Sequence, residues 1–248
     1  MNRVKVRDLQ QTITKAKEGV ETKKLSVLPV LQMLLIVTER ENLSVTGTDL
    51  NVFVTSSCPA LSTERLAWAA PCKELERVAN AFPKDAEVAL SVEEDRLTLH
   101  CGRKEFRLSG IPGRDFPVAP EVDLDAPAAR VSAQGLLDVL ESTTWAASMD
   151  DLRPALNAAR FTGTQVICGN GNVAALAKFE TPALPDSLLP LSVMRALPKL
   201  LDREEPSILR IDKKGAVLIQ QERLSVVCRR VEGAAPVYDR IVPALPLD

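Results

Sequence analysis

Short runs of alternating apolar and polar residues make up most of the chain, and a few stretches with helical spacing interrupt them. Alternation puts every second side chain on one face of a strand, whereas apolar residues three or four positions apart share one face of a helix. In the first half, helical spacing follows residue 6, with Leu9, Ile13 and Ala16 on one face, and returns over 73–82. Alternation predicts strands at 3–6, 30–37, 43–46, 52–56, 87–92, 96–100 and 105–109.

The second half carries the same kinds of pattern. A helix capped by Ser132 would bury Leu136, Leu137 and Leu140, and another helix is predicted over 192–201. Pro198 lies inside that last stretch and should kink or shorten it, because proline has no backbone N–H to donate. Strands are predicted at 129–131, 159–162, 166–168 and 173–179.

These patterns form a repeat. Ala70-Pro71 precedes an amphipathic helix and two alternating strands, and Leu189-Pro190 precedes the same series 119 residues later. A repeat of this length is too large for a solenoid unit and indicates two copies of a whole domain. We therefore predict an α+β protein with antiparallel sheets and two helices per domain. The domains are expected at 1–118 and 129–248, joined by a proline-containing, acidic linker at 119–128.

Composition narrows the class of protein. Of the 248 residues, 46% are hydrophobic and 26% are charged, which suffices for two cores in a soluble protein. The formal net charge of −2 argues against a protein that coats nucleic acid with its whole surface, but a local basic face is compatible with it. The five cysteines lack CxxC spacing and are interpreted as buried, reduced thiols. We expect a cytoplasmic protein with no signal peptide and no membrane span.

No residue pattern typical of an enzyme is found. The single histidine, His100, falls in an alternating strand, where a surface or interface position is the simpler interpretation. The run Gly-Asn-Gly-Asn at 169–172 lies between two predicted strands, so it indicates a hairpin turn and not a phosphate-binding loop. The acidic run at 93–95 is a turn. We predict no catalytic residue, no metal site and no cofactor.

Seven runs of residues resemble the bacterial β sliding clamps, the processivity subunit of DNA polymerase III. They occur in one colinear order over nearly the whole chain. In the first half they are LPVL at 28–31, LSVTGTDL at 43–50, GRKEF at 102–106 and DFP at 115–117. In the second half they are DLRPALN at 151–157, VEG at 231–233 and PVYDRIVP at 236–243.

The resemblance implies a clamp fold and a ring. The β clamps carry three such domains per chain, and two chains close a ring of six domains. This sequence stops five residues after Pro243, where a third domain would begin. We therefore expect a head-to-tail homotrimer, whose twelve helices would line the hole. Such a ring would encircle double-stranded DNA at the nucleoid without sequence preference and tether a DNA polymerase or repair enzyme.

A sliding ring needs a positive inner wall, and three predicted helices offer exposed basic pairs. A spacing of four or eight residues puts both members of a pair on one side of a helix. Basic groups over phosphates give a salt-sensitive attraction that does not depend on sequence. The candidates are Arg7 and Lys15, Lys73 and Arg77, Arg195 and Lys199, and, in the first loop, Lys23 and Lys24. Ordinary solvated helix faces are the alternative, and the helix after Ser132 is an acidic exception.

The resemblance also implies a hydrophobic pocket for the short peptide tails of polymerases and the clamp loader. Leu156, Gly171 and Pro243 match positions of that pocket. The wall that reads Thr-Asp-Gly-His-Arg-Leu in the family reads GNGNVA here, at 169–174. The C-terminal Leu245 and Leu247 are expected either to line a rebuilt groove or to dock as a ligand, and a frayed terminus is the plain alternative.

Two other functions stay open. The chain is also compatible with a clamp-like interaction module that never closes and regulates a clamp, a loader or a polymerase. It is equally compatible with an excised part of a three-domain clamp. The altered pocket wall favours the module, whereas the basic helix faces favour the ring.

Overall fold

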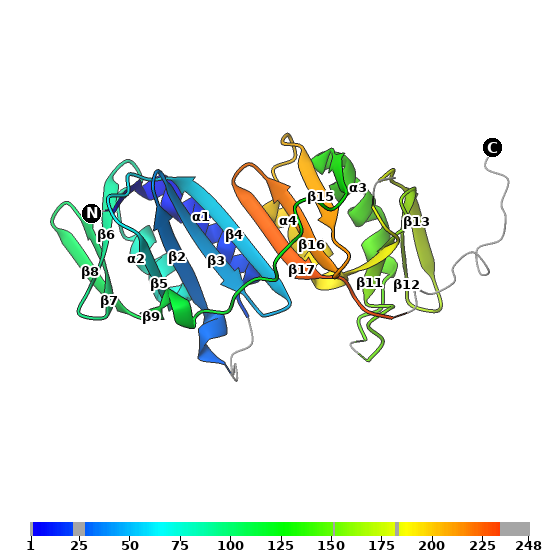
Figure 1. Ribbon diagram of the computed structural model, residues 1–248, viewed down its shortest axis with the longest axis horizontal. Coiled ribbons are helices and arrows are strands. Elements are labelled where there is room, and N and C mark those ends of the chain that lie inside the picture. The colour runs from blue at the N-terminus through cyan, green and yellow to red at the C-terminus, as the bar shows by residue number, and fades with distance from the viewer. Residues whose placement is uncertain (1, 22–27, 151, 182–183, 234–248) are drawn as a thin grey trace. The chain divides into compact units, whose positions relative to one another are not determined.

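The computed structural model describes residues 2–21, 28–150, 152–181 and 184–233 (Figure 1). It consists of two compact units. Unit 1 comprises residues 1–120 and 220–228, and unit 2 comprises 121–219 and 229–248. Nine residues near the end of the described chain, 220–228, therefore belong to unit 1.

Unit 1 contains two antiparallel sheets. One has the strand order β1-β6-β7-β8, with β1 Asn2–Lys5, β6 Glu87–Glu93, β7 Arg96–Cys101 and β8 Lys104–Ser109. The other has the order β17-β4-β3-β2-β5-β9. Its strands are β2 Met33–Glu39, β3 Asn42–Thr48, β4 Val52–Pro59, β5 Leu66–Pro71, β9 Ile111–Pro112 and β17 Leu224–Arg229.

Two helices, α1 Val6–Ala16 and α2 Cys72–Asn80, complete unit 1. Each helix buries one stripe of side chains. The stripe of α1 contains Leu9 and Ile13, and that of α2 contains Leu75 and Val78. The two stripes join the inner faces of both sheets in one apolar core. The opposite faces of the two helices remain open to solvent.

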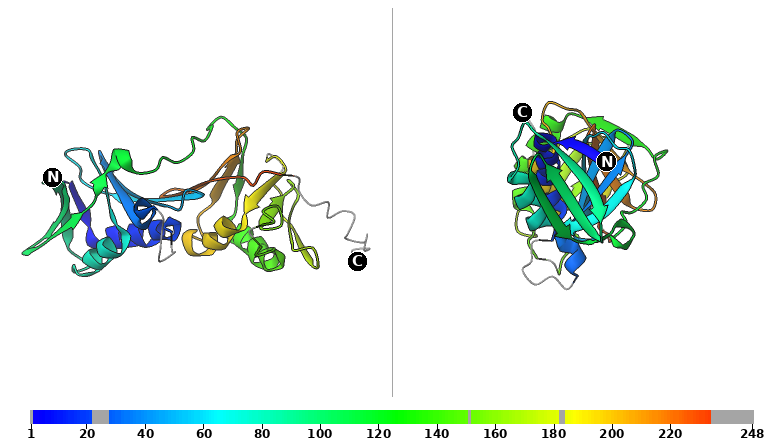
Figure 2. Two further views of the ribbon diagram at one scale, coloured as in Figure 1. Left: turned by 90° about the horizontal axis from the view of Figure 1, so that it is seen from below. Right: turned by 90° about the vertical axis from the view of Figure 1, so that its left-hand side faces the viewer.

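Unit 2 repeats this plan. Its helices are α3 Ala133–Thr143 and α4 Leu191–Leu200. One run of strands has the order β10-β15-β16, formed by β10 Ala128–Val131, β15 Ser207–Ile211 and β16 Ala216–Gln221. A four-stranded sheet has the order β13-β12-β11-β14, formed by β11 Ala158–Phe161, β12 Gln165–Gly169, β13 Ala174–Lys178 and β14 Ser187–Pro190. Figure 2 shows that the helices of each unit lie together on one side of its strands.

The repeat and the fold class are confirmed. Helix α2 begins at Cys72 and α4 begins 119 residues later at Leu191, and both follow directly on a strand. The orders β4-β3-β2-β5 and β13-β12-β11-β14 are the same arrangement in the two units. The structure thus has two units of one plan, with antiparallel sheets and two α-helices each among the described residues.

Several expected boundaries were wrong. The dipeptides before α2 and α4 end strands β5 and β14, which the sequence patterns missed. The strand expected from residue 30 begins only at Met33, since Pro29–Gln32 form a 3₁₀ turn. Val6 opens α1 instead of ending a strand. Pro198 lies in the last turn of α4, where the helix simply ends two residues later.

All five cysteines lie among the described residues, and all of them are free and buried. Burial raises the pKa of the Cys72 and Cys168 thiols to about 11 and that of Cys228 to about 12, so these thiols are protonated at neutral pH. Within the described parts of the chain, no helix is long and apolar enough to cross a membrane. In the same parts, no cluster of acidic, histidine or cysteine side chains could hold a metal ion.

Candidate nucleic-acid interface

Helices α1 and α2 pack side by side in unit 1 and are tied by two polar contacts. The Gln10 side-chain amide donates to the carbonyl of Ala79 at 2.9 Å, and Lys17 Nζ donates to Glu76 Oε1 at 2.6 Å. The hydrogen bond to the Glu76 carboxylate raises the pKa of Lys17. Lys17 is therefore a cation whose charge is already matched within the helix layer, and it is not a candidate for binding phosphate.

The predicted basic residues of unit 1 lie on the solvent side of this helix layer. Arg7 is exposed and lies 3.6 Å from the carboxylate of Asp85, a contact between two solvated side chains that contributes little. Lys15 is half-buried in the last turn of α1. Lys73 and Arg77 are exposed on α2, four residues apart, and form no ion pair with another described residue. Unit 1 thus presents a basic surface of four side chains on two adjacent helices.

In unit 2 the corresponding surface is uneven. On α4, Arg195 and Lys199 are both exposed, as predicted. The Arg195 guanidinium, however, reaches across to the end of α3, where it lies 2.6 Å from the sulfur of Met149 and 3.4 Å from the carbonyl oxygen of Thr144. The exposed face of α3 carries Asp138 and Glu141 and no basic residue. Helix α4 is the basic contribution of this unit, and part of it is held by internal contacts.

The peptide-pocket residues are less completely placed. Leu156 is half-buried, and its N–H donates to the carbonyl of Arg153 at 2.9 Å. Gly171 forms the β12–β13 turn with φ +96°, a conformation that favours glycine. The side chain of Asn170 caps this turn by accepting the N–H groups of Asn172 and Val173. The hairpin predicted at 169–172 is confirmed. Lys23, Lys24, Pro243, Leu245 and Leu247 lie outside the described residues.

A cavity that sequence reasoning missed lies elsewhere in unit 2. It has a volume of about 520 Å³ and is lined by Arg160, Asp186, Arg230 and their neighbours. Arg160 and Asp186 form a two-pronged contact, with N···O distances of 3.1 and 2.6 Å. The pair is polar and neutral as a unit, and one carboxylate accepts both hydrogen bonds from the guanidinium. No sequence motif marks this pair, because Arg160 lies on β11 and Asp186 lies 26 positions later, directly before β14.

The chain is similar in sequence to proteins of a known family. Residues 2–120 match the family described as DNA polymerase III beta subunit, N-terminal domain. The chain is 25% identical over 228 residues to the beta sliding clamp of Pseudomonas putida, and the match covers 87% of this chain and 61% of that protein. It is 26% identical over 225 residues to the beta sliding clamp of Vibrio cholerae, with the same coverage. The chain therefore spans about three fifths of the length of these curated relatives.

Solved structures show the same fold. The DNA polymerase III subunit beta of Pseudomonas aeruginosa superposes with a TM-score of 0.89 at 23% identity, covering 98% of this chain and 68% of that one. A putative DNA polymerase III beta subunit from Eubacterium rectale gives the same TM-score at 16% identity. These comparisons confirm the resemblance inferred from the sequence runs.

Proposed function

We propose that this chain, whose residues 2–120 match the family described as DNA polymerase III beta subunit, N-terminal domain, acts as a sliding clamp on duplex DNA. The observation that supports this most directly is the basic solvent face of α1 and α2, with Lys73 and Arg77 at its centre. A clamp holds DNA by enclosing it, so it needs a wall that attracts phosphates without gripping a particular sequence. Exposed lysine and arginine side chains on rigid helices have that property.

The proposed ring is a head-to-tail homotrimer. Each chain supplies two units of one fold, so three chains would supply six, and a rotationally symmetric head-to-tail interface closes without leaving a free end. In this arrangement the helices would face the DNA, and the strands would form the outer wall. The partners are duplex DNA and, through short peptide motifs, a DNA polymerase and a clamp loader. The location is the cytoplasm, at the nucleoid.

The proposal assigns no enzymatic activity and no cofactor to the chain. The five cysteine thiols are buried, and His100 is an exposed side chain on β7. The work of the molecule would be mechanical, since a closed ring keeps a bound polymerase on its template by topology. Electrostatic attraction would only lower the cost of keeping DNA in the hole.

Two measurements on the wild-type chain test this function together. Native mass spectrometry at micromolar concentration should give a species near three times 27.0 kDa. Binding to duplex oligonucleotides of unrelated sequence should be equal, and it should weaken steeply as the salt concentration rises from about 50 to about 200 mM. A monomer with no affinity for duplex at low salt would contradict the proposal.

The second candidate is a clamp-like module that binds another clamp, a loader or a polymerase without closing. The altered 169–174 wall favours it, because the exposed Asn172 and Val173 stand where the family has a histidine and an arginine. This candidate predicts a monomer at micromolar concentration that forms a stable complex with a full-length clamp. The mass measurement separates the two.

A further inference from the structure

Met149 is the most solvent-accessible methionine among the described residues. It is 71% exposed, whereas Met194 is 1% exposed and Met33 is half-buried. The fourth methionine of the chain, Met1, lies outside the described residues. Methionine is among the residues that proteins most often bury. The thioether of Met149, in contrast, is open to oxidants in solution.

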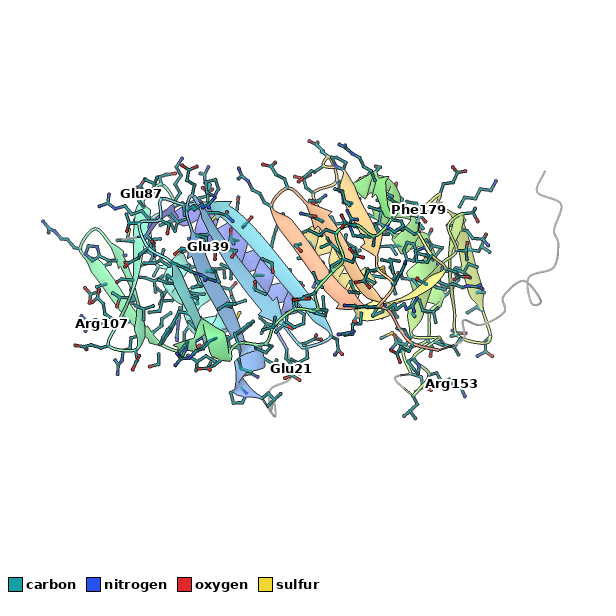
Figure 3. All side chains as sticks on the ribbon, in the orientation of Figure 1. Glu21, Glu39, Glu87, Arg107, Arg153 and Phe179 are labelled. Atoms are coloured by element: carbon teal, nitrogen blue, oxygen red, sulfur yellow. The ribbon has the colours of Figure 1, made fainter. Side chains whose placement is uncertain are left out.

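Backbone hydrogen bonds on both sides hold Met149 in a defined place. Before it, the Ser148 N–H donates to the carbonyl of Leu156 at 3.0 Å, and after it, the Asp150 N–H donates to the Ser148 hydroxyl at 3.1 Å. The Asp150 carboxylate lies 3.7 Å from the guanidinium of Arg153. Arg153 lies at the margin of unit 2 in Figure 3, and its side chain is 67% exposed. Reagents in solution therefore reach this segment directly.

The sulfur of Met149 faces a cation. It lies 2.6 Å from Nη1 of Arg195, and Nη2 of the same guanidinium lies 3.4 Å from the carbonyl oxygen of Thr144. Both contacts are weak, because a thioether sulfur is a poor acceptor and 3.4 Å is long for a hydrogen bond. Arg195 forms no ion pair with another described residue. Its position in unit 2 therefore depends on these two weak contacts.

Oxidation would change this sulfur from a weak acceptor into a group that carries a strong one. Hydrogen peroxide transfers one oxygen atom to the thioether: the O–O bond breaks, an S–O bond forms, and water leaves. The sulfur is oxidised by two electrons and the peroxide is reduced by two. The product is an uncharged sulfoxide whose oxygen carries partial negative charge. Two thiols reverse the step, since the oxygen leaves as water and the thiols become a disulfide.

We infer that Met149 is a reversible oxidation site and that its sulfoxide binds the guanidinium of Arg195. The methionine side chain has three rotatable bonds, and both side chains are exposed, so the new oxygen can turn toward Nη1 without disturbing the core. A hydrogen bond from a guanidinium to that oxygen is charge-assisted and therefore stronger than the present contact with sulfur. Oxidation thus fixes Arg195 against the end of α3.

The consequence for DNA rests on the proposed function. Arg195 is one of the two exposed basic residues of α4, and it attracts phosphates only when its guanidinium turns toward them. A sulfoxide that holds the guanidinium removes this contribution and adds a partial negative charge beside it. Oxidation therefore weakens duplex binding, and reduction by thiols restores it. Arg77 on α2 has no contact of this kind among the described residues, so it serves as an internal reference.

Peptide mapping tests the oxidation site. The wild-type chain is treated with dilute hydrogen peroxide, digested and analysed by mass spectrometry. Met149 should gain one oxygen atom several-fold faster than Met33 and Met194, because those two side chains are less exposed. Met149→Leu keeps an apolar side chain of similar size without sulfur, and it is the matched control for the later measurements. Oxidation of Met33 or Met194 at the same rate as Met149 would overturn the site.

Phenylglyoxal, a reagent for arginine side chains, tests the contact in the absence of DNA. After oxidation, Arg195 should react several-fold more slowly than in the reduced chain, because the sulfoxide engages its guanidinium. Arg77 should react at the same rate in both forms. In Met149→Leu, peroxide should leave the rate at Arg195 unchanged, and circular dichroism checks that peroxide leaves the fold intact. An equal rate at Arg195 before and after oxidation of Met149 would overturn the inferred contact.

Duplex binding separates this inference from the proposed function. Oxidation should weaken the affinity of the wild-type chain by about two- to ten-fold, the effect of one hydrogen bond of ordinary strength, and should not change that of Met149→Leu or Arg195→Gln. If oxidation protects Arg195 from phenylglyoxal but neither form binds duplex, the oxidation site stands and the clamp function fails. If the reduced chain binds duplex and oxidation changes neither the reactivity of Arg195 nor the affinity, the function stands and the inference fails.

Discussion

Arg195 of α4 lies with its guanidinium 3.4 Å from the carbonyl oxygen of Thr144, at the end of α3, and 2.6 Å from the sulfur of Met149. A residue predicted to bind DNA is thus partly engaged in joining two helices of its own unit. Arg77, in the last turn of α2, has no such contact among the described residues. Both helices expose basic side chains, but those side chains differ in their contacts within the unit.

This difference predicts unequal effects of two matched substitutions. Arg77→Gln should weaken binding to duplex DNA more than Arg195→Gln, because the Arg195 guanidinium must first leave Thr144 and Met149. Fluorescence anisotropy with a labelled duplex at about 50 mM salt measures both. A larger effect for Arg195→Gln would show that the side chain swings freely toward the DNA.

Neutralising the centre of the α1–α2 surface should reduce the salt dependence of binding. Lys73→Gln with Arg77→Gln should lower the slope of log affinity against log salt by about 0.9 for each phosphate that the variant no longer neutralises. The matched control is Lys213→Gln with Lys214→Gln, which removes the same charge from the exposed turn before β16. If both double variants reduce the slope equally, overall charge and not the helix surface accounts for binding.

The acidic face of α3 predicts a gain of affinity. Asp138→Lys with Glu141→Lys replaces two exposed carboxylates and extends the basic surface to the fourth helix. Binding to duplex should tighten several-fold at low salt, and the salt slope should become steeper. Unchanged binding would indicate that α3 does not face the DNA.

How far the sequence could predict this structure depends on the element. Helices α2 and α4 were found because each has apolar residues with clean helical spacing and charged residues opposite them. Strand β5 was missed because Leu66-Ala-Trp-Ala-Ala-Pro is apolar almost throughout, so it has no alternation to recognise. The state of Arg195 and the pairing of Lys17 with Glu76 depend on residues 46 to 59 positions away, which no local pattern reports.

The pairing of β17 with β4 was equally hidden from the sequence. Alternation along β4 and β13 says which side chains face inward, but it does not say which strand lies alongside. Only the three-dimensional structure shows that β17 lies antiparallel to β4. The predicted peptide pocket stays a prediction, because Pro243, Leu245 and Leu247 lie outside the described residues.

Asp212 gives a prediction for stability. Its carboxylate is 2% exposed and accepts the N–H groups of Ala216 at 2.8 Å and Asp123 at 3.3 Å. Burial alone would raise the pKa of Asp212, but these backbone hydrogen bonds outweigh it and hold the pKa below its ordinary value. The ionised form therefore stabilises unit 2 above the unfolded pKa of about 3.9, and this stability is lost as the pH falls through the folded pKa.

Asp212→Asn should accordingly lower the free energy of unfolding by about 1–3 kcal/mol at pH 7, because the amide is a weaker acceptor for these N–H groups. The difference from wild type should shrink as the pH falls toward 3. Urea denaturation at pH 7 and pH 3, monitored by circular dichroism, measures it. A difference that stays constant with pH would show that the carboxylate is not the stabilising group.

The most direct test of the clamp is whether the wild-type chain stays on closed DNA and leaves open DNA. The chain is incubated at high concentration with nicked circular plasmid. The salt concentration is then raised to about 0.5 M to remove electrostatic binding, and the plasmid is separated from free protein by gel filtration. We expect the protein to travel with the circle and to be released when a restriction enzyme linearises it. Equal retention on circular and linear plasmid, or none on either, would contradict encirclement.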